Sequence, residues 1–138
     1  LIYGEEAVPF NMYSNQFVPL WEDASIWERM DVDGKYNKLF TGGGIVHFNL
    51  GEHVTSAQAR KIINHAVESG CEHFALNPVY SRCTKGHMSF GEHKLCPKCQ
   101  NPIGERFTRV VGFFTPVSSW NATRREWEFP KRKFKGIE

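Results

Sequence analysis

The sequence predicts an α/β fold that carries a loop-rich metal-binding segment. Two observations indicate this fold: a strand, an amphipathic helix and a second strand follow one another between residues 45 and 77, and cysteines and histidines cluster over residues 81–104. The length of 138 residues, with 41% hydrophobic and 23% charged residues, fits one globular domain. No apolar run approaches the ~18 residues that a membrane span needs.

The first forty residues predict little regular structure. Residues 1–20 are apolar and aromatic but are broken by two prolines, which indicates extended segments and turns. Asp23 is predicted to cap a short helix over residues 25–30. The glycine-rich turn at residues 41–44 then leads into a strand over residues 45–50. The chain opens on Leu1 rather than Met, which we interpret as a sign of a fragment or a split protein.

The clearest predicted helix follows this strand. Thr55 and Gln58 have the spacing of a capping box, and Gly70 stands where a helix commonly ends. The apolar stripe of the helix consists of Ala59, Ile62, Ile63, Ala66 and Val67. A second strand over residues 73–77 completes a βαβ unit, which predicts parallel strands with a right-handed crossover.

The strongest local signal is a set of metal-ligand residues. Cys83 and His87 are followed by a Cys96-Pro-Lys-Cys99 turn, the spacing of a zinc knuckle. Tetrahedral zinc takes four such ligands, and His93 is the competitor of His87 for the fourth position. A site with four protein ligands is structural, and it would stabilise a segment with few core residues. The alternative is a loop of reduced cysteines without metal.

The cysteines indicate a reducing compartment. Four cysteines could form two disulfides in a secreted protein, but three of them have metal-ligand spacing and no signal peptide opens the chain. We therefore expect a cytoplasmic protein. The fourth cysteine, Cys71, is expected to be a buried structural residue.

Residues 107–114 form an apolar run that is interrupted by Gly112. The run predicts a buried strand or an extended finger, and the ordinary explanation of its glycine is a β-bulge or a close backbone approach. The functional alternative is a glycyl radical, because the flanking amide and carbonyl delocalise an electron on a Cα atom that carries no side chain. Residues 118–129 predict a helix capped by Ser118 or Ser119 and ended by Pro130.

The stretch from residue 108 to 121, TRVVGFFTPVSSWN, resembles the glycyl-radical segment of anaerobic (class III) ribonucleoside-triphosphate reductases. In that family an Arg-Val-x-Gly-Tyr/Phe motif follows a cysteine-rich zinc site near the C-terminus. Upstream segments match in the same order, namely residues 13–15, 40–43 and 77–80. The resemblance therefore spans nearly the whole chain.

The resemblance implies both a fold and a division of the chain. Residues 1–80 would be part of a ten-stranded α/β barrel, residues 81–104 the zinc knuckle, and residues 105–138 the glycyl-radical finger loop with its tail. Gly112 would store a radical installed by a separate activase that uses S-adenosylmethionine and an iron–sulfur cluster. The implied partners are the remainder of the reductase, which is a homodimer when complete, and a ribonucleoside triphosphate substrate. The chain alone would be inactive.

Two departures from the family pattern matter. Family zinc sites commonly use two Cys-x2-Cys pairs, whereas position 86 here is Gly, so the fourth ligand is the weakest assignment. The radical-accepting cysteine of the family lies upstream of the matching region, and Cys71 is not expected to replace it.

Two other functions remain open from the sequence. The chain could be a stand-alone radical domain that docks onto a separate catalytic chain. Alternatively, it could be a zinc-ribbon module that binds nucleic acid or protein, in which Gly112 is structural. That module would need basic and aromatic residues on the ribbon. The ribbon segment carries only Arg82, Lys85, Lys94, Lys98 and Phe90.

Overall fold

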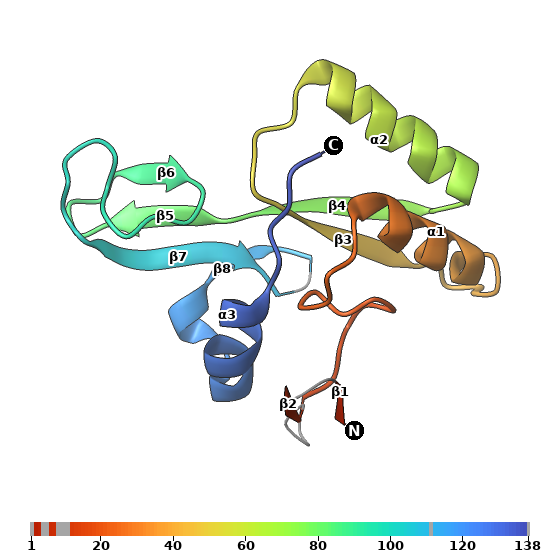
Figure 1. The fold of residues 1–138 in the computed structure, drawn as a ribbon, viewed down its shortest axis with the longest axis horizontal. Coiled ribbons are helices and arrows are strands. Elements are labelled where there is room, and N and C mark those ends of the chain that lie inside the picture. Colours follow the sequence, from red (N-terminus) through yellow and green to blue (C-terminus); the bar gives the residue numbers. More distant parts are fainter. Residues whose placement is uncertain (1, 4–5, 8–11, 111, 138) are drawn as a thin grey trace.

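A computed structural model describes residues 2–3, 6–7, 12–110 and 112–137 (Figure 1). The strands are β1 (Ile2–Tyr3), β2 (Glu6–Ala7), β3 (Ile45–Leu50), β4 (His73–Pro78), β5 (Tyr80–Cys83), β6 (Met88–Phe90), β7 (Ile103–Arg109) and β8 (Phe114–Pro116). The helices are α1 (Ile26–Asn37), α2 (Ser56–Ser69), a 3₁₀ turn (Val117–Ser119), a π-helical turn (Arg124–Glu128) and α3 (Phe129–Lys131). No helix among the described residues is long and apolar enough to span a membrane.

The predicted βαβ unit is confirmed. β3 and β4 pair in parallel in one register from Ile45–His73 to Leu50–Pro78, with α2 between them. The Thr55–Gln58 capping box is formed in both directions, and Gly70 ends α2 at φ 88°. Only glycine adopts this left-handed conformation without strain, which explains its place after the last turn.

The hydrophobic core lies between this unit and α1. It consists of Ile26 and Met30 from α1, Val46, Phe48 and Leu50 from β3, Ile62 and Ala66 from α2, and Ile137 near the C-terminus. β3 supplies alternate residues to this core, as the period of a strand requires. Two alternate positions on the opposite face of β3, His47 and Asn49, are polar and are also buried.

Helix α1 differs from its prediction at both ends. Ser25, not Asp23, is the N-cap, and it forms a capping box with Glu28. The helix continues beyond Met30 to Asn37, and it includes Gly34. A Cβ on Gly34 would lie 2.2 Å from the carbonyl oxygen of Ser69, so the glycine allows α1 to approach the end of α2. The predicted helix ended at Met30, whereas the structure continues it into this helix–helix contact.

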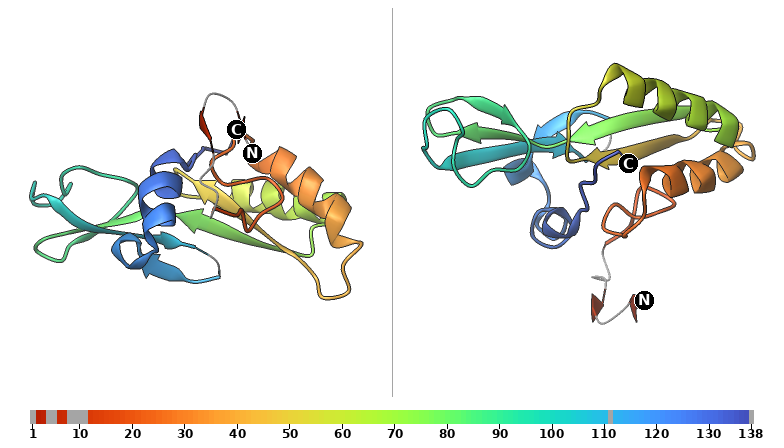
Figure 2. Two further views of the ribbon diagram at one scale, coloured as in Figure 1. Left: turned by 90° about the horizontal axis from the view of Figure 1, so that it is seen from below. Right: turned by 45° about the horizontal axis from the view of Figure 1, so that its top comes forward.

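A four-stranded sheet in the order β6-β5-β7-β8 follows β4 after the single residue Val79. All its neighbouring strands are antiparallel. The end of this sheet formed by β5, β6 and the start of β7, here called the ribbon (residues 80–103), extends away from both long helices in each view (Figure 2). β7 leaves the ribbon and runs back toward β8.

The predicted helix over residues 118–129 is wrong in its details. Ser118 and Ser119 lie in the 3₁₀ turn, and Asn121 Oδ1 accepts the amide of Arg124 instead. The helical segment passes through Pro130 and ends at Lys131, one residue beyond the predicted stop.

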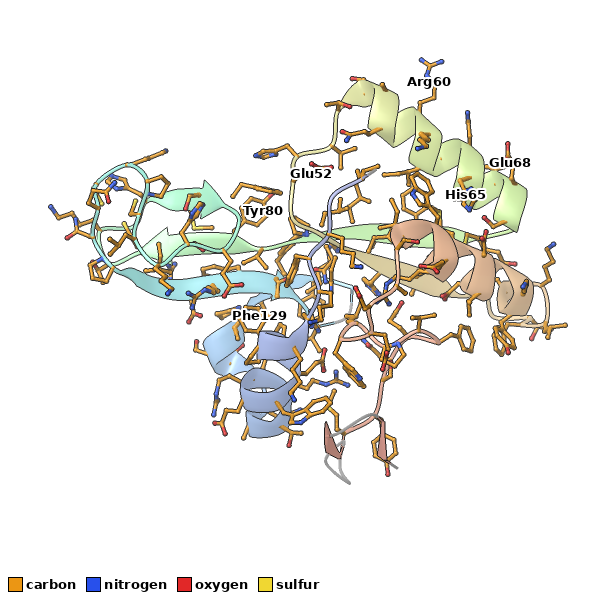
Figure 3. The ribbon with its side chains drawn as sticks, viewed as in Figure 1. Glu52, Arg60, His65, Glu68, Tyr80 and Phe129 are labelled. Carbon is orange, nitrogen blue, oxygen red and sulfur yellow. The ribbon has the colours of Figure 1, made fainter. Side chains whose placement is uncertain are left out.

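The C-terminal segment docks onto the βαβ unit. Lys135 forms a parallel bridge with Leu50, and its amide donates to the Asn49 carbonyl at 3.1 Å. Glu52, which lies beside this segment in Figure 3, accepts from the amide of Ile137 at 2.6 Å. These contacts bring the end of the chain back to the edge of β3 (Figure 1).

Candidate functional site

The ribbon brings Cys83, His87, Cys96 and Cys99 together. Their ligand atoms all lie within 4.8 Å of one another. The Cys83 and Cys99 sulfurs are 3.8 Å apart, and Cys96 Sγ lies 3.9 Å from His87 Nδ1. A tetrahedral zinc ion with bonds of about 2.3 Å to sulfur separates two sulfurs by about 3.8 Å. This Cys₃His cluster could therefore hold a metal ion such as zinc.

Two tight turns present these ligands. In the first, the amides of Cys83 and Gly86 donate to the carbonyls of His87 and Cys83, which returns the chain after β5. In the second, the Cys96 amide donates to the Asn101 carbonyl at 2.8 Å. Each turn contributes a pair of ligands, so the cluster joins two segments of the ribbon.

The surroundings of Cys99 favour its thiolate, whereas burial of Cys96 opposes one. The Asn101 side chain donates to Cys99 Sγ at 3.2 Å and lowers the pKa of Cys99 to about 6. Burial raises the pKa of Cys96, and amides of Lys98 and Cys99 act in the opposite direction. A backbone amide, that of His87, also points to Cys83 Sγ at 3.3 Å. Such donors stabilise negative charge on sulfur, the form that binds metal.

His93 lies outside the cluster. Its Nε2 donates to the carbonyl of Phe90 at 2.7 Å, and its amide donates to Ser81 Oγ. The ring of Phe90 is itself stacked on His53 at 3.8 Å between centroids, with Tyr80 at its edge. The structure thus groups His87, not His93, with the three cysteines.

Gly112 lies in the turn of the hairpin formed by β7 and β8, and it is exposed in this chain. The expectation of a buried strand through Gly112 is therefore wrong: the strand ends at Arg109 and resumes at Phe114. A Cβ on Gly112 would meet no atom within 4 Å. Phe113 and Phe114 beside it are 65% and 38% exposed. The expected finger is a hairpin whose apolar end is uncovered.

A model of the anaerobic ribonucleoside-triphosphate reductase family matches residues 3–134. The chain belongs to this family. A solved anaerobic ribonucleotide reductase is 36% identical to the chain, with a TM-score of 0.78 over 93% of this chain and 20% of that one. No curated protein matches the chain.

Two anaerobic ribonucleotide reductase structures from Thermotoga maritima are also similar. The complex with dATP and CTP is 35% identical, with a TM-score of 0.68 over 86% of this chain and 19% of that chain. The structure with glycerol in the active site is 36% identical, with a TM-score of 0.69 over 88% and 20%. The chain thus spans about a fifth of the length of these reductase structures.

A buried polar network links the reductase βαβ unit to the base of the Gly112 hairpin. The Asn77 side chain donates to Asn49 Oδ1 at 2.7 Å. Asn77 Oδ1 lies 3.0 Å from Thr108 Oγ1 and accepts the Arg109 amide, also at 3.0 Å. Asn77 and Thr108 have no exposed surface, so these bonds are shielded from water.

Sequence reasoning did not identify this network. Its signal was present, because polar Asn49 and Asn77 interrupt two apolar strands at paired positions of the register. The spacing of Arg124, Glu128 and Arg132 by four residues was a second unused signal. Both sets become visible as partners of the hairpin only once the strands and the C-terminal helix are placed in space.

Cys71 has the surroundings of a structural residue. It packs against the core, and its thiol donates to the Met30 carbonyl at 3.2 Å. Burial raises the pKa of Cys71 to about 11, which disfavours the reactive thiolate.

Proposed function

We propose that this chain is the radical-carrying C-terminal part of an anaerobic ribonucleotide reductase and that Gly112 stores the radical. The observation that carries the proposal is the place of Gly112 within the matched family segment, at an uncovered hairpin end where an added Cβ would meet no atom within 4 Å. The proposed reductase converts ribonucleoside triphosphates to deoxyribonucleotides.

The proposed chemistry assigns one hydrogen atom to each step. A separate activase, which uses S-adenosylmethionine and an iron–sulfur cluster, removes a hydrogen atom from the Gly112 Cα and leaves the odd electron there. A cysteine thiol outside this chain then returns a hydrogen atom to Gly112 and becomes the thiyl that starts ribose reduction at the 3′ position. Gly112 is thus regenerated as a closed-shell residue, and the protein positions and shields the radical.

The exposure of Gly112 supports a role for further protein around it. A carbon radical needs shielding from oxygen and water, and this chain does not supply it. Exposed apolar side chains such as Phe113 and Phe114 commonly mark surfaces that another part covers. Since the solved relatives are about five times longer than the chain, we propose that the remainder of the reductase, including its ten-stranded barrel, encloses the hairpin.

Anaerobic activation of the complete reductase tests the radical. We expect a doublet in the electron paramagnetic resonance (EPR) spectrum and, after air is admitted, cleavage of the chain at Gly112. Gly112→Ala should abolish both. Gly104→Ala is the matched control, because Gly104 lies in the same hairpin and an added Cβ would meet neighbours at 3.6 Å or more. An activated protein with no doublet and an intact chain contradicts the proposal.

We further propose that Cys83, His87, Cys96 and Cys99 hold a structural zinc ion. Zinc would supply a closed tetrahedral centre that ties the ribbon turns together, with no open position for chemistry. Cys96→Ser and His87→Ala are expected to lower zinc retention by at least tenfold, as measured by metal analysis after dialysis. His93→Ala should retain it, since its ring binds a carbonyl instead. If His87→Ala retained zinc and His93→Ala lost it, His93 and not His87 would be the fourth ligand.

A stand-alone nucleic-acid ribbon is less well supported. Phe90 already stacks on His53 and has Tyr80 at its edge, so its ring is not free to stack on a base.

A further inference from the structure

Three backbone carbonyls of the described turn residues around Gly112 accept hydrogen bonds from side chains. Arg132 donates to the Arg109 carbonyl at 2.7 Å, and Asn15 donates to the Val110 carbonyl at 2.7 Å. The Arg109 guanidinium donates to the carbonyl of Gly112 itself. The turn is thus held through its backbone oxygens, while the space beside the Gly112 Cα stays open.

Arg132 is the rigid member of this set. Its side chain is fully buried, and its Nε donates to Glu128 Oε1 at 2.9 Å while Nη2 donates to the same oxygen. Its guanidinium lies 4.7 Å from the centre of the Trp120 ring. Glu128 also accepts from Arg124, which in turn donates to the Tyr13 carbonyl at 3.0 Å.

These groups meet because Glu128 lies four residues from both Arg124 and Arg132 on the C-terminal helical segment. The segment includes a π-helical turn over Arg124–Glu128, and such turns occur often at functional sites. The buried Glu128 pairs with both guanidinium groups and compensates the burial of Arg132, whose remaining donor reaches an uncharged carbonyl inside the protein. The C-terminal helical segment therefore fixes the backbone of Arg109.

The side chain of Arg109 connects this fixed backbone to Gly112. Its guanidinium lies 4.5 Å from the centre of the Phe114 ring, across the hairpin, which limits its rotation. From there it donates to the Gly112 carbonyl. Charge-assisted hydrogen bonds of this kind are about twice as strong as neutral ones.

A radical on a glycine Cα is shared between the electron-donating amide nitrogen and the electron-withdrawing carbonyl. A cationic donor on the carbonyl oxygen increases its electron-withdrawing character and fixes its plane. We propose that Arg109 is a positioning residue that orients and polarises the Gly112 carbonyl for radical storage, and that Arg132 holds Arg109 in place. This inference rests on the proposed function of Gly112.

The test uses the complete reductase with its activase and glycine labelled with ¹³C at the carbonyl. The ¹³C and α-proton couplings of the EPR signal report the spin distribution at Gly112, which a role in folding alone would not change. We expect Arg109→Met to change the carbonyl coupling and to lower the radical yield several-fold. Arg109→Lys, which keeps a cationic donor, should give intermediate values.

Arg82→Met is the matched control. Arg82 also stacks on a ring of the hairpin, that of Phe107 at 4.9 Å, but it donates to none of the three carbonyls named above. This variant should have the couplings and yield of the parent. Zinc content and circular dichroism of each variant establish that it is folded.

The possible outcomes separate the two proposals. Parent-like couplings and yield in Arg109→Met would overturn the role of Arg109 while Gly112 keeps its own. If folded Arg109→Met forms no radical, recovery of the signal in Arg109→Lys supports the role and failure to recover it overturns it. An activated parent without any Gly112 signal overturns the proposed function and this inference together.

Discussion

Asp33 is a carboxyl group whose surroundings oppose its charge. It lies on α1, is 2% exposed, and its Oδ2 has no hydrogen-bond partner among the described residues. Burial raises the pKa of Asp33 to about 6, although the positive charge of Arg29 acts in the opposite direction. Because the folded pKa lies above the unfolded value near 4, folding favours the protonated form.

Because the pKa of Asp33 is raised, we predict that the free energy of unfolding falls as the pH rises. Its contribution is fully present below the unfolded pKa and is lost as pH rises through about 6, where ionised Asp33 costs roughly 2–3 kcal/mol. Asp33→Asn should remove this dependence, so its free energy of unfolding in urea should exceed that of the parent at pH 7 and approach it at pH 4. Exposed Glu68→Gln is the control, and equal pH slopes in all three proteins would contradict the prediction.

At the scale of single residues, the sequence predicts what local spacing encodes. The proximity of Cys83, His87, Cys96 and Cys99 followed from two short ligand pairs. The partners of Gly112 did not, because Asn15 and Arg132 reach the turn from distant parts of the chain. Hydrogen bonds to a backbone carbonyl leave no pattern in the sequence around it.

At the scale of elements, α1 and α2 depend on the absence of a side chain at Gly34. A glycine inside a helix costs about 1 kcal/mol relative to alanine, so a residue with higher helix propensity would be expected there. The close approach of the Ser69 carbonyl excludes any side chain at this position. This is why periodicity and capping signals predicted α2 well but ended α1 too early.

Gly34→Ala should destabilise the chain by roughly 2 kcal/mol or more in urea unfolding. The clash with backbone at 2.2 Å requires α1 and α2 to separate, and this cost exceeds the gain in helix propensity. Gly42→Ala is the control because an added Cβ there meets nothing within 4 Å, and its change should stay within about 0.5 kcal/mol. A Gly34→Ala variant as stable as the control would show that the helices adapt.

At the scale of the whole molecule, the ribbon and the βαβ unit are stabilised by different means. The βαβ unit has an apolar core, whereas the buried residues of the ribbon are Ser81, Cys83 and Cys96, of which the cysteines belong to the metal cluster. The sequence predicted this contrast from the distribution of apolar residues. The closed barrel, which would need the rest of the reductase, and the division of the chain at residues 80 and 104 stay predictions.

Removal of metal should therefore loosen the ribbon and leave the βαβ unit folded. Hydrogen–deuterium exchange with a strong chelator is expected to accelerate exchange over residues 80–103 and to leave residues 45–50 and 56–69 unchanged. Cys71→Ser, which spares the cluster, should retain the protection of the ribbon. Unfolding of both parts together, or no change in either, would contradict the prediction.

Strand β7 has a consequence for how this segment can vary. It runs from Ile103, beside the Cys₃His cluster, to Arg109 at the base of the hairpin, a span of about 20 Å at 3.3 Å per residue, and its register with β5 shifts at Gly104. Removing one residue between Glu105 and Arg109 would turn every later side chain to the opposite face and misplace Arg109. This part of the strand is thus a spacer of fixed length, and relatives should not gain or lose residues between Glu105 and Arg109.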